Sequence, residues 1–334
     1  MILNAYTIVM LFIAILTGIL AVPLGFFSFS IYKKWGSQLY DEEKNAIVNR
    51  AYLLLLMAVV ILFIKLLSWP FFYATLQSYV PSIHGAMCIF GVTRIQPNMT
   101  TIAQILKPLV FFSIGAWLLL NRLDRKTETA PLFKRKFLFL FIVSIMIILD
   151  SITDLIYFTG FNIKIFVSCC TTFFDMPERT TAMLPVSILG EGYDRYMLPF
   201  YYASNVLLIV YLAASYPYLS ARSLRLTATG VVLALLNTGI TVFAMFESIA
   251  PNIMNLPLHH CIYCMWQYSP DSVFITAFFI LGMFSCGWAF VLQTSGRHKE
   301  TDILLKGYLI NLYLFACLTT AASLLMVSIH LLFK

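Results

Sequence analysis

Eight long apolar segments alternate with shorter polar connections along this chain of 334 residues. Each segment repeats Leu, Ile, Phe and Val without the alternation of a half-buried strand, and each reaches the roughly 20 residues that a membrane-spanning helix needs. Helices satisfy all their backbone groups internally in lipid, so a helical bundle is favoured over a barrel. The expected spanning helices are residues 5–32, 51–76, 101–121, 137–161, 197–219, 227–250, 272–293 and 308–333.

The composition agrees with this pattern. Hydrophobic residues make up 60% of the chain and charged residues 11%, whereas a soluble domain carries about 25% charged residues. The apolar run from residue 5 to 32 is too long for a cleaved signal peptide, so we expect it to remain as the first span. The sequence therefore predicts an all-α polytopic integral membrane bundle, organised as a single membrane domain over residues 1–334.

Lysine and arginine residues are distributed unevenly between the connections. Fifteen lie in the connections 33–50, 121–136, 220–226 and 294–307, and four lie in the alternate connections 77–100, 162–196 and 251–271. Positive residues mark the cytoplasmic side of a membrane protein, so the first set is predicted to be cytoplasmic and both termini extracytoplasmic. Membrane orientation thus accounts for the net charge of +7. We expect the chain to contact the lipid bilayer and to bind no nucleic acid.

Five of the seven cysteines lie in the three connections predicted to be extracytoplasmic. These connections also contain proline, glycine and large apolar residues, so we expect an ordered extracytoplasmic cap of three Cys-bearing loops. The strongest local pattern is His259-His260-Cys261-x-x-Cys264, since a Cys-x-x-Cys turn brings two sulfurs close enough to chelate an ion or to form a reversible disulfide. The candidate metal ligands are His84, Cys88, Cys169, Cys170, His259, His260, Cys261 and Cys264.

Three chemistries are compatible with these thiols. Cysteines on an oxidising face often pair in structural disulfides, although five thiols cannot all pair with one another. They can also bind a soft metal ion such as copper, zinc or iron. If the chemistry is thiol redox, Cys261 and Cys264 are the catalytic pair, and whether the chain is an enzyme stays open. Cys286, Cys317 and His330 lie within spans and are interpreted as core residues.

The Cys261-x-x-Cys264 tetrapeptide resembles that of quinone-linked disulfide-forming membrane proteins and vitamin K epoxide reductases. Those proteins are smaller bundles, and the His259-His260 prefix and the Cys169–Cys170 pair depart from their patterns. The resemblance covers one tetrapeptide, so it assigns no family. It does imply a quinone as a possible cofactor.

Ionisable residues inside the spans form a second group of candidates, because each costs several kcal/mol in lipid unless it is paired or hydrated. Asp150 and Asp154 are four residues apart and share one helix face. The simplest arrangement pairs them with Lys65 and Lys107 around a polar cavity that opens toward the cysteine loops. This arrangement locks the helices together, forms a proton or ion route, or makes the polar end of a quinone or lipid pocket. The full set is Lys65, Lys107, Asp150, Asp154 and Glu247.

Three functions follow from these candidates. The first is an extracytoplasmic Cys/His site for metal binding or thiol-based electron transfer, with an extracytoplasmic redox or metal-carrier protein as partner. The second is a structural or anchoring subunit that docks other membrane subunits through its capped face. The third is a transporter of a small solute or ion that uses the intramembrane Lys/Asp cluster.

Overall fold

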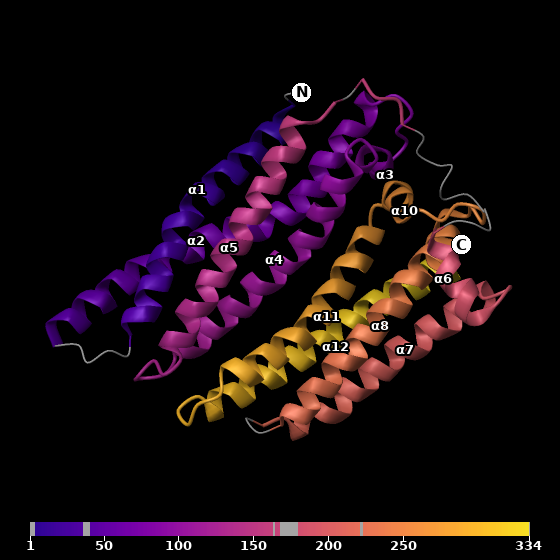
Figure 1. The fold of residues 1–334 in the computed structure, drawn as a ribbon. Helices are drawn as coiled ribbons and strands as arrows, with labels where there is room; N and C mark the ends of the chain where they lie inside the picture. The colour runs from indigo at the N-terminus through magenta and orange to yellow at the C-terminus, as the bar shows by residue number, and fades with distance from the viewer. Residues whose placement is uncertain (1–3, 36–40, 163, 168–179, 221–222, 334) are drawn as a thin grey trace. The chain divides into compact units, whose positions relative to one another are not determined.

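The computed structural model describes residues 4–35, 41–162, 164–167, 180–220 and 223–333. Within these residues every regular element is helical, and eight helices are long and apolar enough to cross a membrane (Figure 1). The all-α polytopic bundle predicted from the sequence is therefore confirmed. The eight candidate spans are Ala5–Lys34, Ile47–Ser82, Pro97–Asp124, Phe133–Thr159, Asp194–Tyr218, Leu224–Met254, Ser272–Ser295 and Asp302–Leu332.

The chain divides into two compact units, Met1–Val167 and Ser168–Lys334. Unit 1 contains four long helices: α1 (Ala5–Lys34), α2 (Asp41–Tyr79), α4 (Pro97–Asp124) and α5 (Phe133–Thr159). Helix α1 packs against α2 and α5, and α4 packs against the same two helices. The four helices therefore form a closed ring in the order α1, α2, α4, α5.

Small residues allow α1 and α5 to approach each other closely. A Cβ atom added at Gly18 would lie 3.1 Å from the Cβ of Ser151, and one added at Gly25 would lie 3.2 Å from the Cβ of Ser144. Small side chains at membrane helix interfaces let the backbones come together and increase van der Waals contact. The α1–α5 contact is built on this principle.

The interior of unit 1 contains both apolar packing and a buried ion pair. One half of the bundle holds a cluster of buried apolar side chains that includes Leu62, Val110, Trp117, Leu140 and Ile147. At the end where α4 passes into α5, a buried ion pair closes the turn, with Lys136 Nζ 2.7 Å from Asp124 Oδ2. The backbone N–H of Leu132 also donates to Asp124 Oδ1 at 2.9 Å. This carboxylate therefore holds both sides of the turn.

The connection between α2 and α4 contains the 3₁₀ turn η1 (Val80–Ser82) and the short helix α3 (Ile89–Thr93). The backbone N–H of Val167 donates to the carbonyl of His84 at 3.1 Å, which joins this connection to the segment that follows α5. Gly85 has φ +85°, and a Cβ there would lie 2.0 Å from the carbonyl oxygen of Val167. Glycine is required at this position for both reasons.

Unit 2 contains the short helix α6 (Thr180–Leu189) and four long helical segments: α7 (Asp194–Ser215), α8 (Leu224–Ala244), α11 (Ser272–Ser295) and α12 (Asp302–Leu332). The 3₁₀ turn η2 (Tyr216–Tyr218) follows α7. Helix α7 packs against α8 and α12, and α11 packs against the same two helices. Unit 2 is thus a ring in the order α7, α8, α11, α12.

The two units share one topology, each being a ring of four long helices in chain order. In each unit a cysteine-bearing connection with a short helix joins the second long helix to the third. In unit 2 this connection follows a π-helical turn, η3 (Met245–Ile249), and contains α9 (Ala250–Met254) and α10 (Ile262–Tyr268). The expectation of one membrane domain over residues 1–334 stays a prediction.

Candidate functional site

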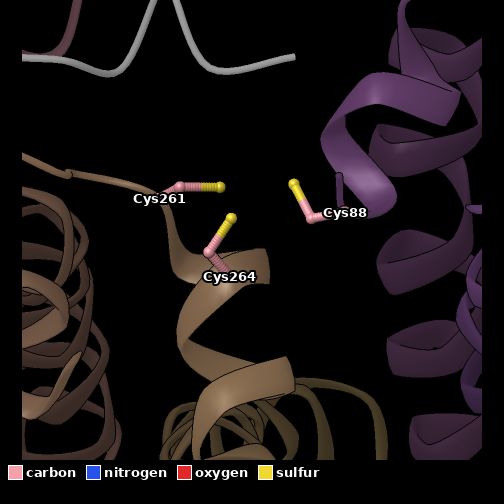
Figure 2. A group of neighbouring side chains, drawn as sticks. All are labelled: Cys88, Cys261 and Cys264. Atoms are coloured by element: carbon pink, nitrogen blue, oxygen red, sulfur yellow. The ribbon is translucent and has the colours of Figure 1, made fainter. Parts of the chain in front are cut away.

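The Cys-x-x-Cys pattern lies at the beginning of α10 in unit 2. Cys261 has an extended backbone and caps the helix, and Cys264 lies on its first turn. Residues three apart on a helix share a face, and the two sulfur atoms lie within 4.8 Å of each other (Figure 2). This spacing allows both sulfurs to bind a single soft metal ion after a small adjustment of their side chains.

Helix α10 is anchored to α11, which gives the pair a fixed base. Trp266 Nε1 donates to Thr276 Oγ1 at 3.2 Å, and Ser272 Oγ donates to the carbonyl of Met265 at 3.3 Å. Met265 is fully buried, and Cys264 packs against the same apolar cluster. The thiol pair is therefore held by packing in unit 2.

The π-helical turn at the end of α8 positions His260. Ala250 donates its N–H to the carbonyl of Met245, five residues back. Pro251 has no N–H for the next such bond, and His260 Nδ1 lies 3.1 Å from the carbonyl oxygen of Phe246 instead. A carbonyl only accepts hydrogen bonds, so Nδ1 carries the hydrogen and Nε2 is the basic nitrogen of the neutral ring.

Glu247 lies on the same π-helical turn and is buried. The hydroxyl of Tyr193, which precedes α7, donates a short hydrogen bond to Glu247 Oε2. His260 Nδ1 lies 3.8 Å from that oxygen. Glu247 was among the intramembrane candidates of the sequence. Its contact with Tyr193 was not predicted, because nothing in the local sequence distinguishes Tyr193 from other tyrosines near the ends of the spans.

His259 is buried beside this group. Burial lowers the pKa of His259 below its ordinary value of 6.5, because a low-dielectric environment disfavours the charged imidazole. A neutral imidazole is the form that binds a metal. However, neither His259 nor His260 belongs to the group of closely spaced ligand atoms that contains Cys261 and Cys264. Their role as direct ligands stays a prediction.

The remaining sequence candidates belong to other elements of the chain. Cys88 precedes α3 in unit 1, where Figure 2 labels it, and His84 is an exposed residue of the same connection. Cys169 and Cys170 lie outside the described residues. Cys286 is buried within α11 and Cys317 is half-buried within α12, in agreement with their interpretation as residues of the helix interior.

The second group of candidates is assembled inside unit 1. Lys65 on α2 lies 2.7 Å from Asp150 Oδ2 and 3.9 Å from Asp154 Oδ2. Lys107 on α4 lies 3.3 Å from Asp150 Oδ1 and 2.8 Å from Asp154 Oδ1. Each ammonium group thus contacts both carboxylates of α5, and all four side chains are buried. The pairing expected from the sequence is present, and we call these residues the Lys/Asp quartet.

Neutral groups complete the surroundings of the Lys/Asp quartet. Lys65 Nζ donates to Ser151 Oγ at 3.2 Å, and the Ser151 hydroxyl lies 3.3 Å from that of Thr17 on α1. Lys107 Nζ lies 4.6 Å from the centre of the Phe72 ring, which is a cation–π distance. All four long helices of unit 1 therefore contribute to this site.

Unit 2 carries a neutral polar network that the sequence analysis did not identify. Asn237 Nδ2 on α8 donates to Asn205 Oδ1 on α7 at 3.1 Å, and Ser204 Oγ donates to Asn237 Oδ1 at 2.7 Å. Asparagine residues within the predicted spans could have indicated this network, because a side-chain amide in lipid needs a hydrogen-bond partner.

These features define a class of protein, an all-α polytopic membrane protein with eight candidate spans and a thiol pair in one connection. Comparison with known proteins does not narrow this class. No family model, no curated protein and no solved structure matches the chain significantly.

Proposed function

We propose that this membrane protein binds a soft metal ion at an extracytoplasmic thiol site, with Cys261 and Cys264 as its central ligands. The observation that carries the proposal is the proximity of the two sulfurs, within 4.8 Å, at the anchored start of α10. Thiolates select soft or borderline ions such as copper(I) and zinc. The extracytoplasmic location rests on the lysine and arginine distribution of the sequence.

The ligand set extends, in this proposal, to Cys88. Its connection and that of Cys261 are predicted to share one face of the membrane, and each follows the second long helix of its unit. A set of two or three thiolates fits copper(I), which accepts few ligands, whereas zinc requires four. His259, His260, Cys169, Cys170 and His84 are the candidates for a fourth position.

The test is a measurement of bound metal in protein purified under reducing conditions. Elemental analysis and copper(I) titration against a competing chelator should give about one ion per chain in the wild type. The variant carrying Cys261→Ser and Cys264→Ser should lose it. Cys317→Ser is the matched control, because it removes a thiol from the same unit outside the site.

Two results would overturn the proposal. One is wild-type protein that binds no copper or zinc although its thiols are reduced. The other is equal binding by the wild type and the double serine variant. A Cys261–Cys264 disulfide that forms and is reduced reversibly, without any bound metal, would favour the thiol-exchange function instead. Peptide mass spectrometry with and without reductant distinguishes these states.

A further inference from the structure

A series of polar side chains leads from the Lys/Asp quartet to the end of unit 1 at which α1 begins. Tyr157 follows Asp154 by three residues on α5 and is fully buried. Its ring and that of Tyr79 on α2 both pack against the ring of Phe161, and its hydroxyl makes no hydrogen bond of standard geometry within the described chain. A buried hydroxyl of this kind normally has a water molecule or another small partner.

The series continues from Tyr79 to the start of α1. The hydroxyl of Tyr79 is hydrogen-bonded to that of Thr7, and Thr7 Oγ1 donates to Asn4 Oδ1 at 2.7 Å. Asn4 Nδ2 in turn donates to Ser78 Oγ at 2.8 Å. Asn4 is half-buried, so it lies between the interior and the end of the bundle. Hydroxyl groups both donate and accept, which is what proton movement along a chain requires.

The interior on the other side of the Lys/Asp quartet is mainly apolar, with Ser28 and Ser144 as its buried hydroxyl groups. The buried cluster that includes Leu62, Val110 and Ile147 fills it, and the next buried ion pair is Asp124–Lys136 at the turn from α4 to α5. Polar groups are thus more numerous between the quartet and the start of α1, whereas the side toward the opposite end is filled mainly by apolar side chains.

We propose that unit 1 contains a proton-binding site at the carboxylates of Asp150 and Asp154, reached from the end at which α1 begins. The two ammonium and two carboxylate groups balance in charge. Uptake transfers a proton from hydronium at that end to one carboxylate. One O–H bond of hydronium breaks and leaves water, one O–H bond forms on the carboxylate, and the charge of the quartet changes from zero to +1. Asp154 is the preferred acceptor, because it precedes Tyr157 by about one turn of α5 and is the carboxylate nearer to the start of the polar series.

A metal cation fits this site poorly. Both carboxylates are already in contact with Lys65 and Lys107, so an incoming cation would meet two positive charges. A proton adds to an oxygen without displacing either lysine. Helix α1 contributes only the neutral Thr17 to the site, and the titratable groups that face it from the other three helices are Lys65, Tyr79, Lys107, Asp150, Asp154 and Tyr157.

Infrared difference spectroscopy of the reconstituted protein tests this inference. A shift from mildly alkaline to mildly acidic pH should produce the C=O stretching band of a buried carboxylic acid in the wild type. The variant with Asp154→Asn and Lys107→Gln keeps the charge balanced and should lose the band. The variant with Asp124→Asn and Lys136→Gln removes a buried ion pair elsewhere in unit 1 and should retain the band.

The path has its own test. Tyr157→Phe leaves the Lys/Asp quartet intact, so the band should still form, but more slowly after a rapid change of pH. The proposal is overturned if the wild type shows no such band, which would mean that the carboxylates stay ionised and only hold the helices together. It is also overturned if the band persists both in the Asp154/Lys107 variant and in a corresponding variant with Asp150→Asn and Lys65→Gln.

Discussion

The ammonium group of Lys65 lies 2.7 Å from Asp150 Oδ2, and both side chains are buried between α2 and α5. Neither group can reach bulk water without opening unit 1, so each depends on the opposite charges of the Lys/Asp quartet, and each is the closest counter-charge of the other. Removal of one partner from a buried pair leaves an isolated charge, whereas removal of both leaves an apolar contact.

Single and paired substitutions of this pair should therefore differ. Asp150→Asn is expected to destabilise the protein by about 3–5 kcal/mol, because Lys65 loses its closest counter-charge. Asp150→Leu combined with Lys65→Met should be considerably milder. Thermal unfolding followed by tryptophan fluorescence in lipid nanodiscs measures both. Equal losses for the single and the paired variant would contradict the account.

The close approach of α1 and α5 can be tested at Gly25. Alanine there would place its Cβ 3.2 Å from the Cβ of Ser144, and overpacking of this kind costs about 1–3 kcal/mol. Gly239 on α8 is the matched control, because a Cβ there meets no atom within 4 Å. Gly239→Ala should be neutral or stabilising by up to about 1 kcal/mol through helix propensity. The test compares the unfolding temperatures of the two variants with that of the wild type. A higher unfolding temperature in both variants would refute the packing argument.

Asp124 should hold the turn from α4 to α5. Asp124→Ala removes the ion pair with Lys136 and the acceptor for the N–H of Leu132. Asp124→Asn retains an acceptor but loses the charge. The expected order of stability is wild type, then asparagine, then alanine, with a loss of about 3 kcal/mol or more for alanine. Limited proteolysis of residues 125–131 should accelerate in the same order, and an unchanged cleavage rate in the alanine variant would argue against this role.

The sequence predicted the elements and the Lys/Asp quartet for general physical reasons. Uninterrupted apolar segments of sufficient length leave few alternatives to spanning helices. Buried charges must be neutralised, and Asp150 and Asp154 share a helix face with two lysines available on other spans. The eight spans and the pairing of these four residues are both present in the structure.

Other contacts escaped prediction because they depend on tertiary structure. Asp124 lies in a polar, basic connection and has the sequence signature of a solvated residue, yet it is fully buried. His330 was expected in the core, but it lies near the end of α12, partly exposed, with Nε2 2.8 Å from Asp271 Oδ2. The pattern of hydrophobic residues also gives no sign of the π-helical turn at Met245–Ile249. This turn determines that His260 contacts the carbonyl of Phe246.

The Asp271–His330 contact should give a small dependence of stability on pH. Partial burial alone raises the pKa of Asp271, but hydrogen bonds from Ser269 and His330 and the nearby imidazole charge outweigh it and lower the pKa below its ordinary value of 3.8. The folded state therefore binds the proton more weakly than the unfolded state. The contribution of Asp271 to stability is present above pH 3.8 and is lost as the pH falls through the lowered folded value.

Asp271→Asn tests this linkage. The carboxylate is largely exposed, so the variant should lose less than about 1 kcal/mol near neutral pH. The difference from the wild type should disappear in acid below the folded pKa of Asp271. Unfolding temperatures measured across this range decide the matter, and a difference that is unchanged in acid would show that the carboxylate charge does not contribute.

The contact between His260 and the π-helical turn should support the proposed metal site. Loss of the Nδ1–H bond to the carbonyl of Phe246 releases the residue that directly precedes Cys261. Groups that orient metal ligands typically change metal affinity by about 10- to 100-fold when they are removed. His260→Leu should therefore weaken copper(I) binding within that range, and His260→Gln should recover part of it, because the glutamine amide can donate to the same carbonyl. His298→Leu, in an exposed position of unit 2 outside the candidate ligands, is the control. A larger loss there than in the leucine variant at position 260 would contradict the assignment.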